Sequence, residues 1–156
     1  MTDGVEAFKL SLLAAFPPRP FHGLVSTHDK SGEGIDLRAE LSGKRWDEIP
    51  VAFIDLNSAS LSLMEPEALV FFLPAWLLRS MERLGDESML SKFTLYFLCP
   101  GNEQEGWDED CIAAMADLFN SDQRDVVGAY LRAVLQVDEP RYWHSYAKHG
   151  LRWWRR

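Results

Sequence analysis

The chain has 156 residues, 47% of them hydrophobic and 26% charged, with a formal net charge of −8. This composition excludes a disordered, collagen-like or low-complexity chain, because such chains bury too little apolar surface to offset their conformational entropy. Two cysteines are too few for a disulfide scaffold, and no zinc-type Cys/His spacing occurs. The longest apolar run, residues 68–78, is shorter than the ~20 residues of a membrane-spanning helix, and the first residues do not resemble a signal peptide. We therefore expect a soluble, cytoplasmic domain over residues 1–156.

The charge is unevenly distributed along the chain. Residues 141–156 hold five cations and no acid, so residues 1–140 carry 11 cations against all 24 acids, a net charge of −13. An acidic body repels phosphate backbones and anionic membrane surfaces. The imbalance argues against nucleic acid and membranes as partners and favours a basic protein.

The first predicted elements are a helix and a loop. Apolar residues at helical spacing predict a helix over residues 5–16, with Asp3 as its N-cap. The prolines within residues 17–20 end it, because proline lacks the amide hydrogen and clashes with the preceding turn. The glycine-containing stretch 21–34 is predicted to be an irregular loop.

Two short helices are predicted next. Residues 35–41 can form a helix that ends at Gly43, a residue suited to a left-handed C-terminal cap. A second helix is predicted to start with Asp47 as its cap and to bury apolar residues among positions 51–56.

The central predicted element is an apolar helix that starts at Pro66, a residue suited to the first helical position. Residues 68–78 are apolar on all sides, which is typical of a helix enclosed by its neighbours. Pro74 should kink this helix or divide it in two. A buried strand over residues 68–73 is the alternative, since periodicity alone does not assign a short apolar run.

Helices also account for the second half of the chain. Residues 87–98 are predicted to be helical, although an alternation of aromatic and leucine residues leaves a strand open. A helix is predicted from Asp108, another with Asn120 as its cap, and a last one that starts at residues 138–140 and ends at Gly150.

Together these elements predict a mainly α fold. We expect a single compact helical domain around a buried central helix kinked at Pro74, with an irregular loop at residues 21–34. The basic, aromatic segment 141–156 would pack on this domain or extend from it. The sequence does not indicate an oligomeric state.

Several segments together resemble a known family. They are Ala15-Phe16-Pro17, Trp46-Asp47-Glu48-Ile49-Pro50 followed by Phe53-Ile54, residues 61–77 with Pro66-Glu67-Ala68 and Leu73-Pro74-Ala75-Trp76-Leu77, residues 118–123 with Val126-Val127 and Tyr130-Leu131, and Tyr142-Trp143. The family consists of small, uncharacterised bacterial proteins described only as a domain of unknown function. The resemblance implies a compact, mainly helical domain and supplies no catalytic residues. The acidic stretch 102–110 and the Arg/Trp-rich end depart from the family pattern.

The candidate metal ligands form no recognisable site. His22 and His28 lie in the predicted loop with Glu33 nearby, but their spacing matches no zinc pattern. Solvated loop residues are therefore the favoured interpretation, and a metal site is the alternative. His144 and His149 are five residues apart, which places them on different faces of a helix.

No side chain has the sequence surroundings of an activated nucleophile. Ser58 and Ser60 lack the glycines of a nucleophile elbow. Cys99 and Cys111 are typical of small core residues rather than reactive thiols. The acids of residues 103–110 are typical of a solvated loop, because the EF-hand pattern is absent. We therefore expect no cofactor, and an enzymatic role is not favoured.

The aromatic and basic C-terminal segment is the least generic feature of the sequence. It could bind a protein partner, a membrane interface or nucleobases, or it could fold back so that its rings cover apolar core. Fold-back is favoured, and a protein interface comes next. The candidate partner-binding residues are Trp143, Tyr146, Trp153, Trp154, Arg152 and Arg155.

Two functional hypotheses remain. The first is a non-catalytic interaction protein with an acidic surface, and a specific version of it is an immunity or antidote protein that blocks a basic toxin. The second is a small hydrolase or metal-dependent enzyme that uses the loop from His22 to Glu33. The acidic body favours the first.

Overall fold

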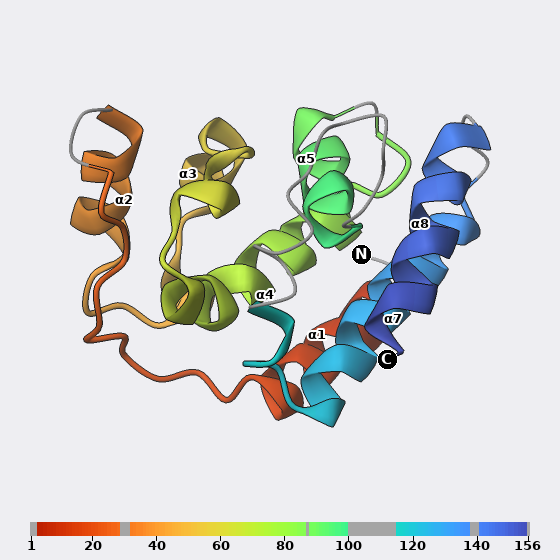
Figure 1. Ribbon diagram of the computed structural model, residues 1–156, viewed down its shortest axis with the longest axis horizontal. Coiled ribbons are helices and arrows are strands. Elements are labelled where there is room, and N and C mark those ends of the chain that lie inside the picture. The colour runs from red at the N-terminus through yellow and green to blue at the C-terminus, as the bar shows by residue number, and fades with distance from the viewer. Residues whose placement is uncertain (1–2, 29–31, 87, 100–114, 138–140, 156) are drawn as a thin grey trace.

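The computed structural model describes residues 3–28, 32–86, 88–99, 115–137 and 141–155 (Figure 1). Within these residues every regular element is a helix, so the predicted mainly α fold is confirmed. The α-helices are α1 (Asp3–Ala15), α2 (Gly32–Leu41), α3 (Val51–Leu56), α4 (Pro66–Glu82), α5 (Met89–Leu98), α7 (Ser121–Leu135) and α8 (Arg141–Trp154), and the 3-10 helices are η1 (Trp46–Glu48) and η2 (Ser60–Leu63). None of the described helices is long and apolar enough to cross a membrane.

Helix α4 is the centre of the arrangement. It contacts α1, α3, α5, α7 and η1. In Figure 1 it crosses the middle of the molecule, with α2 at one end and the paired helices α7 and α8 at the other. Both termini lie near the α7–α8 end.

The predicted enclosure of this central helix is confirmed. Phe72, Leu73, Trp76 and Leu77 are fully buried in α4. The helix is continuous through Pro74, so the alternatives of two separate helices and of a buried strand are both wrong. Pro74 removes one backbone hydrogen bond at a cost of ~3 kcal/mol, and burial of the apolar side chains on both sides of it offsets that cost.

Helix α2 begins earlier than predicted, at Gly32 rather than at residue 35. The reason is a close approach between the helix and the segment before it. A Cβ at Gly34 would overlap the carbonyl oxygen of His28. Arg38 of the same helix donates from Nη1 to the Ser26 carbonyl oxygen at 3.0 Å. The glycine therefore allows helix packing here instead of marking a loop.

The helix predicted to start near Asp47 is divided by Pro50. Trp46–Glu48 forms η1, and α3 starts after Pro50, which is its N-cap. A residue before proline is pushed out of the helical conformation, and Ile49 accordingly has φ −72° and ψ 124°.

The next predicted helices are confirmed with small shifts. α5 begins two residues later than predicted, because the Ser88 side chain caps it by accepting a hydrogen bond from the Ser91 amide. The alternative of a strand at this position is wrong. Asn120 caps α7 as predicted, and the Gln123 side chain completes the capping box by bonding the Asn120 amide. The helix predicted from Asp108 lies outside the described residues.

Helix α8 does not end at Gly150, as the sequence suggested, but continues to Trp154. Gly150 is buried where α8 crosses α5 and α7. A Cβ at this position would lie 2.8 Å from Cys99 Sγ and 3.1 Å from Leu131 Cδ1. The glycine therefore allows the close approach of three helices rather than terminating one.

A Gly150→Ala substitution tests this explanation. We expect it to lower the free energy of unfolding in urea by about 1–3 kcal/mol, because the added methyl group overpacks the helix crossing. The matched control is Gly4→Ala in α1, where an added Cβ has no neighbour within 4 Å. The control should be neutral or stabilise the protein by up to ~1 kcal/mol through its higher helix propensity. Equal effects of the two substitutions would contradict the proposed close approach.

Candidate functional site

The aromatic residues of the C-terminal segment mostly lie inside the protein. Tyr146, Trp153 and Trp154 are 5–7% exposed, and the Trp154 indole nitrogen donates to the Leu98 carbonyl oxygen at 2.7 Å. The Trp154 ring also packs edge-on against Phe119, with 5.2 Å between the ring centroids. These rings therefore anchor α8 to the rest of the molecule.

The remaining candidates of that segment are more accessible. Trp143 is half-buried, and Arg152 on α8 and Arg155 directly after it are exposed. Partner binding by this segment stays a prediction, and its exposed described residues are Ser145, Lys148, Arg152 and Arg155.

The candidate metal ligands are not gathered into a site in the described structure. His22 and His28 are both exposed, and Glu33 lies in the first turn of α2. His144 is held by a hydrogen bond between its Nε2 and the Val137 carbonyl oxygen at 2.8 Å. Within the described residues, no three His, Cys, Asp or Glu side chains are placed to hold a metal ion. The acidic stretch 102–110 lies outside these residues.

The candidate nucleophiles also have surroundings typical of structural residues. Cys99 is 1% exposed, and burial raises the pKa of its thiol, which keeps it neutral at physiological pH. Ser60 is buried in η2, and its hydroxyl contacts the Asn57 side chain at 3.5 Å. Cys111 lies outside the described residues.

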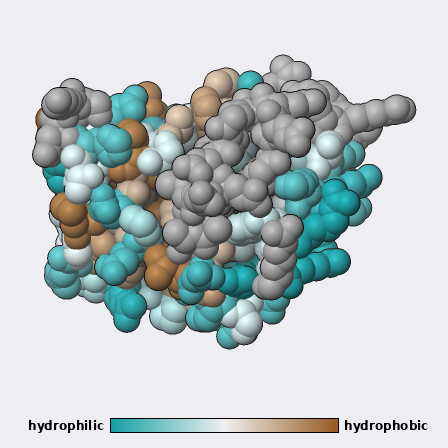
Figure 2. All heavy atoms as spheres, in the orientation of Figure 1, coloured by the Kyte–Doolittle hydropathy of each residue, from teal (hydrophilic) through white to brown (hydrophobic). Residues whose placement is uncertain are grey.

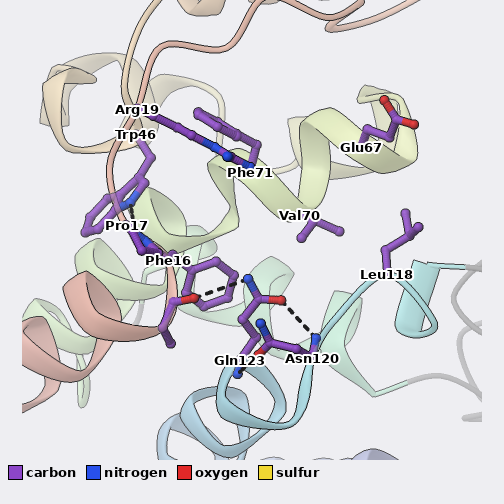
Figure 3. A pocket seen from close by; sticks show the side chains of 11 residues that line it. Phe16, Pro17, Arg19, Trp46, Glu67, Val70, Phe71, Leu118, Asn120 and Gln123 are labelled. Atoms are coloured by element: carbon purple, nitrogen blue, oxygen red, sulfur yellow. Dashed lines mark hydrogen bonds between the residues drawn. The ribbon is translucent and has the colours of Figure 1, made fainter.

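A groove of about 430 Å³ lies beside the end of α1, and we call it the α1–α4 groove. Figure 3 shows it from close by. Its lining comes from segments far apart in the chain: Ala15, Phe16, Pro17, Arg19, Trp46, Glu67, Val70, Phe71, Leu118, Asn120 and Gln123. Helix α4 forms one wall, and the segment before α7 forms another (Figure 3).

Hydrogen bonds to the end of α1 hold the groove in shape. The last carbonyl groups of a helix lack partners within it. Here the Trp46 indole nitrogen donates to the Phe16 carbonyl oxygen at 2.8 Å, and Gln123 Nε2 donates to that of Ala15 at 3.2 Å. Because η1 and α7 supply these donors, both are fixed to the same end of α1.

The accessible surface of the groove combines apolar and charged side chains. Val70 and Phe71 are half-buried, and Leu118 is 46% exposed. Exposed Arg19 and Glu67 lie toward opposite ends of the groove in Figure 3. Such a surface can bind an apolar side chain of another molecule. A cation next to that side chain would then lie against the Glu67 carboxylate.

Sequence reasoning did not identify this groove as a site. One signal was nevertheless present, because several of the segments that carry the family resemblance, among them residues 15–17, 61–77 and 118–123, contribute to its lining. The sequence did not show that these segments meet.

Several cations of the acidic body are paired within the protein. Lys44 binds Glu40 at 2.8 Å, and Arg45 binds Asp47 at 2.6 Å. The most extensive ion pair joins α3 to α4. Arg79 bonds both carboxylate oxygens of Asp55, at 2.7 and 2.9 Å, and Arg83 lies 3.7 Å from the same carboxylate.

Comparison with known proteins assigns the chain to a family. Residues 25–156 match the model of a family described as a family of unknown function (DUF6714). The chain belongs to DUF6714. This match confirms the family resemblance found in the sequence. Residues 15–17, which also carry the resemblance, precede the matched part of the chain. No curated protein and no solved structure matches the chain significantly. Membership of DUF6714 therefore leaves the function to be inferred from the groove and the charges of the chain itself.

The Asp55–Arg79 pair predicts how stability depends on pH. Its hydrogen bonds hold the pKa of Asp55 below the ordinary value, so the pair contributes stability above the unfolded-state pKa of about 3.9 and loses it as pH falls through the lower folded-state value. Asp55→Asn should therefore reduce the free energy of unfolding by about 1 kcal/mol at pH 7, and the difference from wild type should shrink below about pH 3.9. Urea unfolding at several pH values measures both quantities.

The control for this measurement is Asp36→Asn, which changes an exposed carboxylate on α2. It should alter the free energy of unfolding little at any pH. A difference between Asp55→Asn and wild type that stays constant from pH 7 to pH 2 would contradict a contribution from the ionised pair.

Proposed function

We propose that this protein is a non-catalytic interaction module whose α1–α4 groove binds a basic segment of another protein. The observation that carries the proposal is an accessible apolar groove beside carboxylates that no cation of the described structure neutralises. Glu67 lines the groove, is exposed and has no ion pair within the described residues. A lysine or arginine of a partner would supply the missing positive charge.

The rim of the groove is negative overall. Exposed Asp117 and Asp122 are the sequence neighbours of the lining residues Leu118 and Gln123. Together with Glu67 they are three exposed carboxylates among the lining residues and their sequence neighbours. The cations in the same set are Arg19, Arg124 and Arg45, of which Arg45 pairs with Asp47. Charge complementarity therefore favours a basic partner, as does the net charge of −13 of residues 1–140.

The apolar part of the groove defines the second requirement on the partner. An apolar side chain next to a partner cation would pack against Val70, Phe71 and Leu118 and remove them from water. Burial of apolar area contributes ~25 cal/mol per Å², so this contact supplies affinity while the charges supply orientation and a faster association rate. The described surface combines both features in one place.

An immunity or antidote protein that blocks a basic toxin is the specific role we propose within this class. Such a protein needs a surface complementary to its target and no catalytic residues of its own. An acidic body that attracts the target over a distance also suits this role, because electrostatic steering raises association rates.

Site-specific photo-crosslinking in the source organism tests the proposal. A photoreactive phenylalanine analogue replaces Leu118 in the groove, and the same analogue at Leu56, which is 85% exposed on α3, is the control. We expect a basic protein to be captured at position 118 and not at position 56. With that protein purified, the association rate should fall about tenfold or more when the salt concentration is raised from low to high.

Charge-reversal variants distinguish binding at the groove from a general attraction to the acidic surface. Glu67→Lys should strongly reduce capture, whereas Asp36→Lys, an equal change of charge on α2, should reduce it only slightly. Equal loss with both variants would show that the attraction is diffuse and not directed to the groove. Capture of an acidic protein, or of no protein at low salt, would contradict the proposal.

A further inference from the structure

A second groove, of about 300 Å³, lies between α7 and α8, and its charge is opposite to that of the body. We call it the α7–α8 groove. Its lining residues are Ser121, Arg124, Asp125, Gly128, Arg132, Leu151, Trp154 and Arg155. The lining therefore contains three arginines and one carboxylate, although acids outnumber cations in the chain as a whole. Figure 2 shows that hydrophilic side chains gather over this end of the molecule.

The first arginine is fixed in place by the backbone. Arg124 donates from Nη2 to the Ala116 carbonyl oxygen at 2.7 Å and from Nε to that of Phe119 at 3.3 Å. Its guanidinium is half-buried at the start of α7. These bonds fix the orientation of the guanidinium at the groove.

The second arginine folds back over a glycine one helical turn before it. A Cβ at Gly128 would lie 3.3 Å from Arg132 Nη1 and 3.9 Å from Nη2. The guanidinium of Arg132 therefore lies against the surface of α7 beside the groove. Within the described residues, Arg132 and Arg155 have no ion pair that would satisfy their charge, and both are exposed.

We propose that the α7–α8 groove binds the phosphate group of a small soluble molecule. A guanidinium presents parallel N–H groups that match phosphate oxygens in a bidentate arrangement. Arg132 on α7 and Arg155, directly after α8, provide two such groups, and Arg124 adds a third guanidinium, held by backbone carbonyl groups, to the lining. Trp154 and Leu151 contribute apolar side chains to the same lining.

The surrounding charge favours a small anion over a nucleic acid. Three arginines against Asp125 give the groove a local charge of +2, whereas residues 1–140 have a net charge of −13. A long polyanion would meet the acids of the body beyond the groove. A single phosphate group meets the arginines and one carboxylate, that of Asp125. This site uses none of the residues that line the α1–α4 groove, so it stands independently of the proposed function.

Titration with inorganic phosphate at constant ionic strength, followed by NMR of the arginine Nε–Hε signals, tests the proposal. We expect saturable shifts of the Arg132 and Arg155 signals. Arg132→Gln and Arg155→Gln should each weaken binding about tenfold, the usual effect of losing a hydrogen bond to a charged group. The matched control is Arg152→Gln, which removes one exposed positive charge from α8 at a residue that does not line the groove. This substitution should change the affinity for phosphate by about twofold or less.

The other outcomes overturn the proposal. Shifts that stay linear with phosphate concentration would mean that no site exists. Equal weakening by Arg132→Gln, Arg155→Gln and Arg152→Gln would mean a diffuse attraction to the positive end of the molecule. Tighter binding of a single-stranded oligothymidylate than of phosphate would identify a nucleic-acid surface instead. Circular dichroism of each variant confirms that the fold is retained.

Discussion

The enclosure of α4 is the constraint on which the rest of the structure depends. Its fully buried residues include Phe72, Leu73 and Trp76, and burying each such side chain contributes about 1.5–3 kcal/mol. The Trp76 indole nitrogen also donates to the Asn57 carbonyl oxygen at 3.2 Å, which fixes the end of α3 against α4. Because α4 contacts five other elements, the position of each of them is set by the same apolar surface.

The two grooves lie where elements around this core are not fully packed against one another. The α1–α4 groove lies where α1 ends at a proline run and its last carbonyl groups take donors from Trp46 and Gln123. The α7–α8 groove lies where the Arg132 guanidinium packs over Gly128 on α7. One groove has an acidic rim and the other is lined by arginines, so the two present opposite charges to possible ligands. This separation is the most informative functional property of the molecule.

The sequence was sufficient to predict the helical class and the central helix, because both depend on local patterns of apolar residues and caps. The wrong predictions of helix boundaries concern residues at which packing overrides the local sequence pattern. Gly34 and Gly150 resembled loop and termination signals, but each allows a backbone to approach a neighbour too closely for any side chain. Pro50 divided a helix whose apolar spacing looked continuous.

The grooves could not be predicted, because they depend on contacts between distant parts of the chain. The hydrogen bond from Gln123 to Ala15 joins residues 108 positions apart. The arginines of the α7–α8 groove are scattered as Arg124, Arg132 and Arg155, and in the sequence only the last belongs to an evident basic segment. The C-terminal tryptophans, by contrast, agree with the favoured prediction that the segment folds back, since the rings of Trp153 and Trp154 are buried.

Native-state hydrogen exchange of the backbone amides of α4 tests the central claim most directly. If the rest of the chain encloses this helix, its amides from Leu69 to Ser80, Pro74 excepted, exchange only through global unfolding, with a free energy of exchange equal to that of unfolding in denaturant. The amides of α2, at the edge of the molecule in Figure 1, should exchange through smaller openings. If the amides of α4 exchange through local openings, with a free energy of exchange lower than that of the α2 amides, the account is contradicted.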